Sequence, residues 1–294
     1  MNRMSFLFFC FFVGFSAGPL CAQYRQDDSQ SSQTESQSVW RKLFSGFNGN
    51  MAFSMPLRRS NPQQRPGLVS QGEEALVPSI LATLNYAPKS YWFFTTTFYA
   101  YFPDKNQAPW DPDFSYRFGY EDWHPFTLSL TYANYEGNRL FPSGNKDEKF
   151  TRISEGTLDL GWKFALPTAW EHPLKIHETS SLGLRVDYYF TPRYEDQPSN
   201  TQKSSKQAFG FTARYAIYKW WFVMVTAKYY PKSSQQQTWD PDFIYEFGYF
   251  DWHPGTFALR YSNYSGTRYP WRTQISDTGT IRDGTLSLSW SWAF

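Results

Sequence analysis

Apolar and polar residues alternate one by one along most of the chain after residue 47. The last run is the clearest, because Leu286, Leu288 and Trp290 fall on one side of an extended strand while Ser287 and Ser289 fall on the other. A period of two residues predicts β-strands with one apolar and one polar face. Twelve such strands are predicted, near residues 48–57, 79–87, 91–102, 113–122, 126–135, 156–166, 182–190, 207–217, 220–230, 242–251, 256–264 and 284–294.

The connections between these runs alternate in length. Residues 88–90 and 121–125 are short turns, whereas residues 58–78, 103–112 and 136–153 are longer loops. Both ends of the strand region then fall on the short-turn side, which allows the first and last of an even number of antiparallel strands to pair and close a barrel. One connection on that side, at 167–180, is long and departs from the scheme.

The chain also contains an internal repeat. Residues 110–139 match residues 239–268 at an offset of 129, with 20 of 30 paired residues identical, and GTLDLGW at 156–162 answers GTLSLSW at 284–290. Self-similarity at a fixed offset indicates a duplicated structural unit. The prediction is a tandem of two six-strand units, at 48–166 and 181–294.

The composition indicates whether the apolar faces lie against lipid or within a packed protein core. Aromatic residues make up 21% of the chain, yet the mean hydropathy is −0.59. The alternative to a membrane protein is a soluble sandwich of two sheets, but a packed interior favours aliphatic side chains that interdigitate. Here rings such as Phe114, Tyr116 and Phe118 form the apolar face, and charged residues lie on the opposite one. This pattern favours an all-β transmembrane barrel, with rings toward lipid and polar residues toward a lumen.

The first 47 residues are predicted to lie outside the barrel. Residues 1–22 have a positive start, a short apolar run and small residues before a cleavage point, which predicts a signal peptide. Residues 23–47 are mostly polar and predict a disordered leader. Cys10 and Cys21 both lie in the signal peptide, and Leu20 disfavours lipoprotein processing at Cys21. Removal of this segment changes the net charge from +2 to about +1, which gives no indication of a nucleic-acid partner.

The signal peptide, the twelve amphipathic strands, the alternating loop lengths and the C-terminal Trp292-Ala293-Phe294 together resemble Gram-negative outer-membrane β-barrel proteins. The resemblance covers residues 48–294 and is one of architecture. It implies residence in the outer membrane, contact with its lipid, short turns in the periplasm and recognition of Phe294 by the outer-membrane assembly machinery. Twelve-stranded members include solute channels, a phospholipase and a lipid A deacylase, so the fold alone does not select a function.

Charged residues on the polar faces are the main clue to function. Six positive and four negative residues are predicted to point into the lumen: Arg117, Lys163, Arg185, Arg214, Lys228, Arg260, Glu121, Asp159, Asp187 and Glu246. They indicate either ion pairs that plug a narrow barrel or a weakly cationic passage, with saccharides and small anions as candidate solutes. Small inward residues such as Ser287, Ser289 and Gly161 favour the passage. A pore or transport component is therefore predicted, with a plugged structural or surface-interaction barrel as the alternative.

Enzymatic chemistry is less well supported by the sequence. An outer-membrane lipase of the known kind needs a His and a Ser two residues apart, and no His-x-Ser occurs among the four histidines, which are His124, His172, His177 and His253. Without a base beside a nucleophile, acyl transfer has no candidate site, so no catalytic residue and no cofactor are predicted. A lipid-acting enzyme with an unrecognised motif remains the third alternative.

Two repeated motifs have both a local and a functional interpretation. The DWHP turns, with His124 and His253, are explained by turn hydrogen bonds, and the functional alternative is a docking site for a periplasmic partner. The WDPD motifs carry paired carboxylates, Asp111 with Asp113 and Asp240 with Asp242, which suit a divalent cation, although Asx-Pro turn geometry is favoured. No metal site is predicted.

Overall fold

The structure is a computed structural model that describes residues 46–57, 77–89, 91–102, 107, 111–135, 137–142, 149–196, 201–237, 240–251, 253, 255–263, 267–272 and 281–293. The predicted signal peptide, residues 23–45 of the predicted leader and the terminal Phe294 lie outside these residues.

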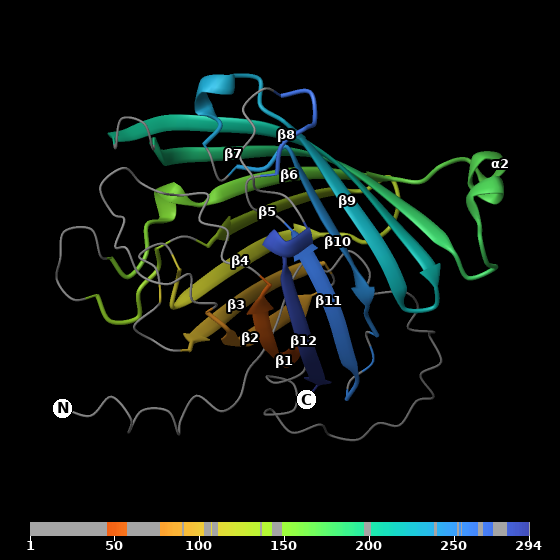
Figure 1. Cartoon of the computed structure of the whole chain (residues 1–294), viewed down its shortest axis with the longest axis horizontal. Coiled ribbons are helices and arrows are strands. Elements are labelled where there is room, and N and C mark those ends of the chain that lie inside the picture. Colours follow the sequence, from red (N-terminus) through yellow and green to blue (C-terminus); the bar gives the residue numbers. More distant parts are fainter. Residues whose placement is uncertain are drawn as a thin grey trace.

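Twelve strands form one closed antiparallel barrel (Figure 1). Each strand pairs with its neighbours in sequence, and β1 pairs with β12 from Asn48 opposite Ala293 to Pro56 opposite Thr285, which closes the sheet. The strands are β1 (Phe47–Pro56), β2 (Ser79–Lys89), β3 (Trp92–Tyr101), β4 (Phe114–Glu121), β5 (Leu128–Asn134), β6 (Thr157–Phe164), β7 (Ser181–Asp196), β8 (Thr201–Tyr218), β9 (Trp221–Tyr229), β10 (Phe243–Tyr249), β11 (Phe257–Asn263) and β12 (Thr285–Ala293). The all-β barrel and its strand number are therefore confirmed, as is the architectural resemblance to outer-membrane β-barrel proteins.

The described helices are short. They are α2 (Thr168–Glu171) and the 3-10 turns η3 (Ile153–Glu155), η4 (His172–Leu174), η5 (Ser233–Gln235) and η6 (Ile281–Asp283). Within the described part of the chain, none of them is long and apolar enough to cross a membrane.

The barrel is polar inside and apolar outside. The largest fully buried side chains are all polar: Asn138, Asn263, Thr83, Thr267, Asp242 and Ser129. Rings and aliphatic side chains on alternate strand positions are exposed instead, among them Phe118, Leu160, Phe211, Val225 and Leu288. A soluble sandwich would bury the second set and expose the first, so this alternative to the barrel is wrong.

The hairpin of β7 and β8 is longer than the sequence predicts. The predicted strands end at 190 and restart at 207, but pairing continues from Thr191 opposite Lys206 to Asp196 opposite Thr201. The two strands contain 16 and 18 residues, whereas the other ten contain 7 to 11. Most residues of this extension are polar on both faces, so the backbone pairs but no period of two marks the strands. The hairpin extends beyond the neighbouring strands at the top of the barrel in Figure 1.

Equivalent contacts occur in the two sequence units. The Tyr132 hydroxyl donates to the Ile153 carbonyl at 2.7 Å, and at the corresponding place the Tyr261 hydroxyl donates to the Ile281 carbonyl at 2.8 Å. A Cβ atom added at Gly248 would lie 2.2 Å from the Leu259 carbonyl oxygen, and one at Gly119, the matching glycine of β4, would lie 2.2 Å from the Leu130 carbonyl oxygen. Both positions therefore require glycine for close strand approach. The duplication itself remains an inference from the sequence.

The long connection between β6 and β7 is tied to the outside of the barrel through Tyr215. It contains α2 and η4, which stand apart from the strands at the right of Figure 1. The hydroxyl of Tyr215, on the outward face of β8, donates to the Leu174 carbonyl at 2.6 Å and accepts from the Ile176 backbone N–H at 3.1 Å. Trp170 and Ile176 are 67% and 77% exposed. Apolar side chains therefore extend the outer surface at the short-turn end of the barrel.

Candidate functional site

Six charged side chains meet inside one wall of the barrel, on β4, β6 and β7. This central ion-pair cluster contains Arg117, Glu121, Asp159, Lys163, Arg185 and Asp187. Arg185 is its centre: its Nη1 lies 2.7 Å from Glu121 Oε1, its Nη2 lies 2.7 Å from Asp159 Oδ2, and its Nε contacts Asp187. Glu121 also accepts from Arg117 at 2.7 Å and lies 3.2 Å from Lys163. Three positive and three negative charges balance.

Strand register creates the space for Arg185. Glu121, Ser129, Gly161 and Asp187 face one another in a row across β4, β5, β6 and β7. The two middle residues are small, so a trough separates the two carboxylates. A Cβ atom at Gly161 would lie 2.5 Å from Arg185 Nη2, which shows that the guanidinium occupies this trough. Gly161, one of the small inward residues that favour a passage, is therefore covered by this guanidinium.

The central ion-pair cluster is nearly closed to solvent. The side chains of Arg185, Lys163 and Glu121 are 6%, 8% and 4% exposed. Charges in such an environment are tolerated because they are paired, and removing one partner leaves a costly isolated charge. The cluster therefore fixes the relative positions of three strands and narrows this side of the lumen.

The other four predicted lumen residues lie on β8 to β11 and do not join the cluster. Arg260 Nη2 lies 2.6 Å from Glu246 Oε1. The Arg214 guanidinium lies 4.7 Å above the centre of the Phe222 ring, and the Lys228 ammonium lies 5.1 Å above the ring of Tyr189. These four residues carry three positive charges and one negative charge, so the surplus of positive charge lies on this wall.

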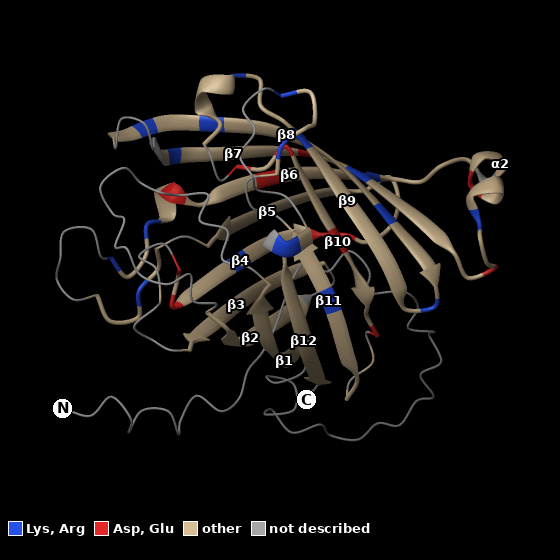
Figure 2. Cartoon of the chain, viewed as in Figure 1, with Lys and Arg blue, Asp and Glu red and all other residues tan. Residues whose placement is uncertain are grey.

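The opposite wall carries hydroxyl and amide groups instead of charges. β1, β3 and β12 contain no charged residue, as their uniform tan colour in Figure 2 shows, and β2 contains only Lys89 at its end. Thr83 and Thr97 hydrogen bond across β2 and β3 at 2.6 Å, and Ser54 contacts Ser287 at 3.2 Å. A solute in the lumen would therefore meet charges on one side and neutral hydrogen-bonding groups on the other.

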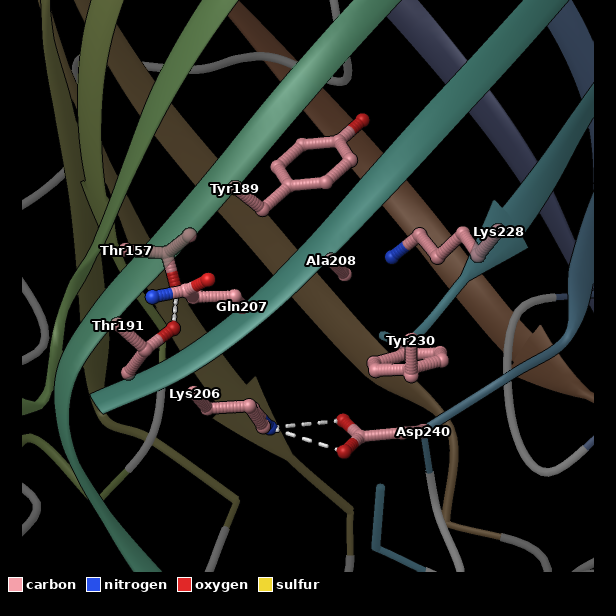
Figure 3. Close-up of a pocket in the computed structure, with 9 residues that line it drawn as sticks. All are labelled: Thr157, Tyr189, Thr191, Lys206, Gln207, Ala208, Lys228, Tyr230 and Asp240. Atoms are coloured by element: carbon pink, nitrogen blue, oxygen red, sulfur yellow. Dashed lines mark hydrogen bonds and ion pairs between the residues drawn. The ribbon is translucent and has the colours of Figure 1, made fainter. Parts of the chain in front are cut away.

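A cavity of about 100 Å³ opens on the inner face of β6 to β9, toward the long-loop end (Figure 3). Lys206, Lys228 and Asp240 bring charge to it, and Tyr189 and Tyr230 bring rings. We call it the lysine cavity. Lys206 Nζ lies 2.9 and 3.0 Å from the two Asp240 oxygens. The hydroxyls of Thr157 and Thr191 hydrogen bond to each other at 2.7 Å on the far side of the space.

Tyr230 contributes a neutral phenolic hydroxyl group to this cavity. It follows the last residue of β9, and burial, with a further contribution from the nearby Asp240 charge, raises the pKa of its phenol above the usual value. A raised pKa keeps the proton on the oxygen throughout the neutral range. Tyr230 therefore remains a hydrogen-bond donor.

The WDPD carboxylates are held by basic and backbone groups at the long-loop end. Asp113 lies 3.1 Å from Arg139 and accepts from the Leu140 N–H at 3.0 Å. Asp242 lies 2.6 Å from Arg272 and accepts from the Tyr269 N–H at 2.9 Å. Among the described residues no group of three or more acidic, His or Cys side chains is placed to hold a metal ion. These contacts join loops far apart in the sequence and hold the carboxylates in place, and the Asx-Pro turn geometry stays a prediction.

The histidines of the DWHP turns make local hydrogen bonds. Asp122 Oδ1 lies 2.6 Å from His124 Nδ1 and accepts from the His124 N–H at 3.0 Å, and Asp251 makes the same two contacts with His253 at the same distances. Thr127 donates to the His124 carbonyl at 2.6 Å. These contacts explain the repeated motif as turn structure. A periplasmic partner remains an untested prediction.

Sequence reasoning missed the lysine cavity. Lys206 was assigned to a loop because the predicted eighth strand began at 207, and Tyr189 was read only as part of a strand. The sequence interprets Asp240 as part of an Asx-Pro turn or as a cation ligand. A signal was present in the sequence. If the alternation of the two strands is continued into the hairpin, Thr191, Lys206 and Ala208 all fall on the inward face.

A scan against models of protein families and a search of curated proteins both find no match to the chain. Among solved structures, the chain is similar to an outer membrane channel from Pseudomonas putida F1, with 11% sequence identity and a TM-score of 0.38, over 84% of this chain and 95% of that one.

Proposed function

We propose that the chain is an outer-membrane β-barrel that passes small hydrophilic solutes through a narrow polar lumen. The observation that carries the proposal is the inverted distribution of side chains, with polar residues buried inside a closed barrel and apolar residues exposed around it. Lipid is the solvent that makes such an exterior favourable, and a wetted interior makes the polar lining favourable. Export by the predicted signal peptide and reading of Phe294 by the assembly machinery complete this proposal for a Gram-negative cell.

The lumen charges support weak selectivity for anions. The central ion-pair cluster is neutral, and Lys206 is balanced by Asp240. Arg214, Lys228 and Arg260 then outnumber Glu246 by two charges. A surplus of positive charge on a narrow, low-dielectric path raises the local concentration of anions.

A structural barrel without transport is the second candidate. It is favoured by Arg185, which fills the trough beside Gly161 and closes part of the cross-section. An enzyme has no comparable support, because His124 and His253 are engaged by turn aspartates and His172 and His177 lie exposed in the long connection.

Conductance in planar bilayers separates the two candidates. We expect discrete single-channel steps for the purified chain and a reversal potential, in a KCl gradient, that indicates weak anion preference. Lys228→Glu should shift this potential toward cations by reversing one lumen charge. Lys219→Glu, in the exposed turn between β8 and β9, makes the same charge change outside the lumen and should leave it nearly unchanged. Absence of any conductance would support the structural barrel and contradict our proposal.

A further inference from the structure

We propose that the lysine cavity binds the carboxylate or phosphate group of a small solute, with the Lys228 ammonium as its principal contact. The inference rests on the proposed function in one respect, since it names the class of solute that the lumen selects. The site itself is carried by the geometry of the cavity residues.

The cavity contains one positive charge more than it contains negative charges. Lys206 and Lys228 face it together with the single carboxylate of Asp240. Both Asp240 oxygens are already engaged, because they lie 2.9 and 3.0 Å from Lys206 and one also accepts from the Gln237 N–H at 2.8 Å. Within the described part of the chain, Lys228 forms no ion pair and is held over the Tyr189 ring at 5.1 Å. A part-buried ammonium of this kind is stabilised when an anion occupies the adjoining space.

The position of Tyr189 is itself built by the sheet. A Cβ atom at Gly210 would lie 2.8 Å from the Tyr189 ring, so the glycine of β8 accommodates the ring of β7. The ring then supports Lys228, which is directly opposite Gly210 on β9. A ring face below an ammonium attracts the positive charge and holds it in place. In Figure 3 the Lys228 ammonium points into the space between Tyr189 and Tyr230.

The remaining lining groups suit an oxyanion with an attached polar body. Tyr230 keeps its phenolic proton because burial raises its pKa, and Thr157 and Thr191 supply hydroxyls. A charged head group can take the ammonium while sugar-like hydroxyls meet these neutral groups. The volume of about 100 Å³ accommodates a head group, with the rest of the solute extending into the lumen.

The first sequence unit lacks this charge. Tyr99 occupies the position that corresponds to Lys228 at the offset of 129, and its hydroxyl contacts Ser115 at 2.9 Å. The cation is therefore not required by the repeated strand architecture. Tyrosine is a residue that the equivalent strand position already accommodates, which provides a variant expected to fold.

Equilibrium binding to the full chain in detergent micelles tests the site directly. The probes are glucuronate, glucose 6-phosphate and the uncharged glucose, measured by titration calorimetry. We expect both anions to bind and glucose to bind at least tenfold more weakly. Binding of only one anion identifies carboxylate or phosphate as the preferred group. Equal binding of glucose would overturn the proposal.

Variants then assign the binding to Lys228. Lys228→Tyr should weaken anion binding by about ten- to a hundredfold, the range expected for one charge-assisted contact. Lys228→Arg should retain affinity within a few-fold, and the exposed Lys219→Met should change nothing. Unchanged affinity in Lys228→Tyr, with the heat-resistant folded band intact on gel electrophoresis, would refute the role of Lys228.

The outcome is distinguishable from a failure of the pore. Conductance without anion binding retains the proposed function and rejects this site. Anion binding that depends on Lys228, in a barrel without conductance, retains the site and rejects transport.

Discussion

Arg185→Met should destabilise the folded barrel through the central ion-pair cluster. The guanidinium contacts three carboxylates, and its side chain is only 6% exposed. At 2.7 Å and an effective dielectric constant near 20, one such contact corresponds to about 6 kcal/mol of Coulomb energy, most of which offsets desolvation. The variant leaves Asp159 and Asp187 without their cation, whereas Glu121 keeps Arg117 and Lys163. We therefore expect a loss of about 3–5 kcal/mol in the free energy of unfolding.

Urea unfolding from lipid vesicles, followed by tryptophan fluorescence, measures this change. The matched control is the triple variant Arg185→Met, Asp159→Asn, Asp187→Asn, which removes the two carboxylates that would otherwise be unpaired. Because the cost arises from isolated charge, the control should recover most of the lost stability. If the single variant loses less than about 1 kcal/mol of unfolding free energy, the cluster is accessible to water and the reasoning is refuted. A triple variant that is no more stable than the single one would also refute it.

Two further changes test neighbouring features. Gly161→Ala places a Cβ atom 2.5 Å from the Arg185 guanidinium and should lower the free energy of unfolding by about 1–3 kcal/mol, while Gly183→Ala, whose nearest contact would be at 3.9 Å, should stay close to wild type in the same urea assay. Tyr215→Phe removes two hydrogen bonds to the connection between β6 and β7 and should raise the rate of tryptic cleavage after Lys175 by about tenfold, with little change in global stability; an unchanged rate would show that the hydroxyl does not hold this segment.

The fold could be predicted from the sequence because one face of each strand lies on the apolar exterior and the other on the polar interior. Leu286, Leu288 and Trp290 face outward, and Ser287 and Ser289 face inward. Apolar and polar residues therefore alternate with the two-residue period of the strand. All twelve predicted strands are present, and their bounds differ by at most two residues outside one hairpin. The exception is the β7–β8 hairpin, where polar residues predominate on both faces of the extension and no alternation marks the strands.

The candidate site was harder to predict. Alternation along a strand shows which face a side chain lies on, but not which residues of the neighbouring strands lie beside it. The alternation placed the ten charged residues on the inward face. It did not reveal that Arg185 contacts the carboxylates of three other residues. Gly161 illustrates the limit: a small residue indicates empty space only if no neighbouring strand fills it. The lysine cavity was missed because no alternation marks the hairpin that carries Lys206, and its partner Asp240 lies 34 positions further along the chain.

The extended β7–β8 hairpin has a consequence for how the protein can be observed on cells. At about 3.3 Å per residue, an 18-residue strand measures about 60 Å, roughly twice the thickness of a hydrocarbon core, whereas a 7-residue strand such as β10 is only about 23 Å long. In the proposed orientation the excess stands clear of the outer leaflet. An epitope tag inserted between β7 and β8 should therefore be labelled by antibody on intact bacteria.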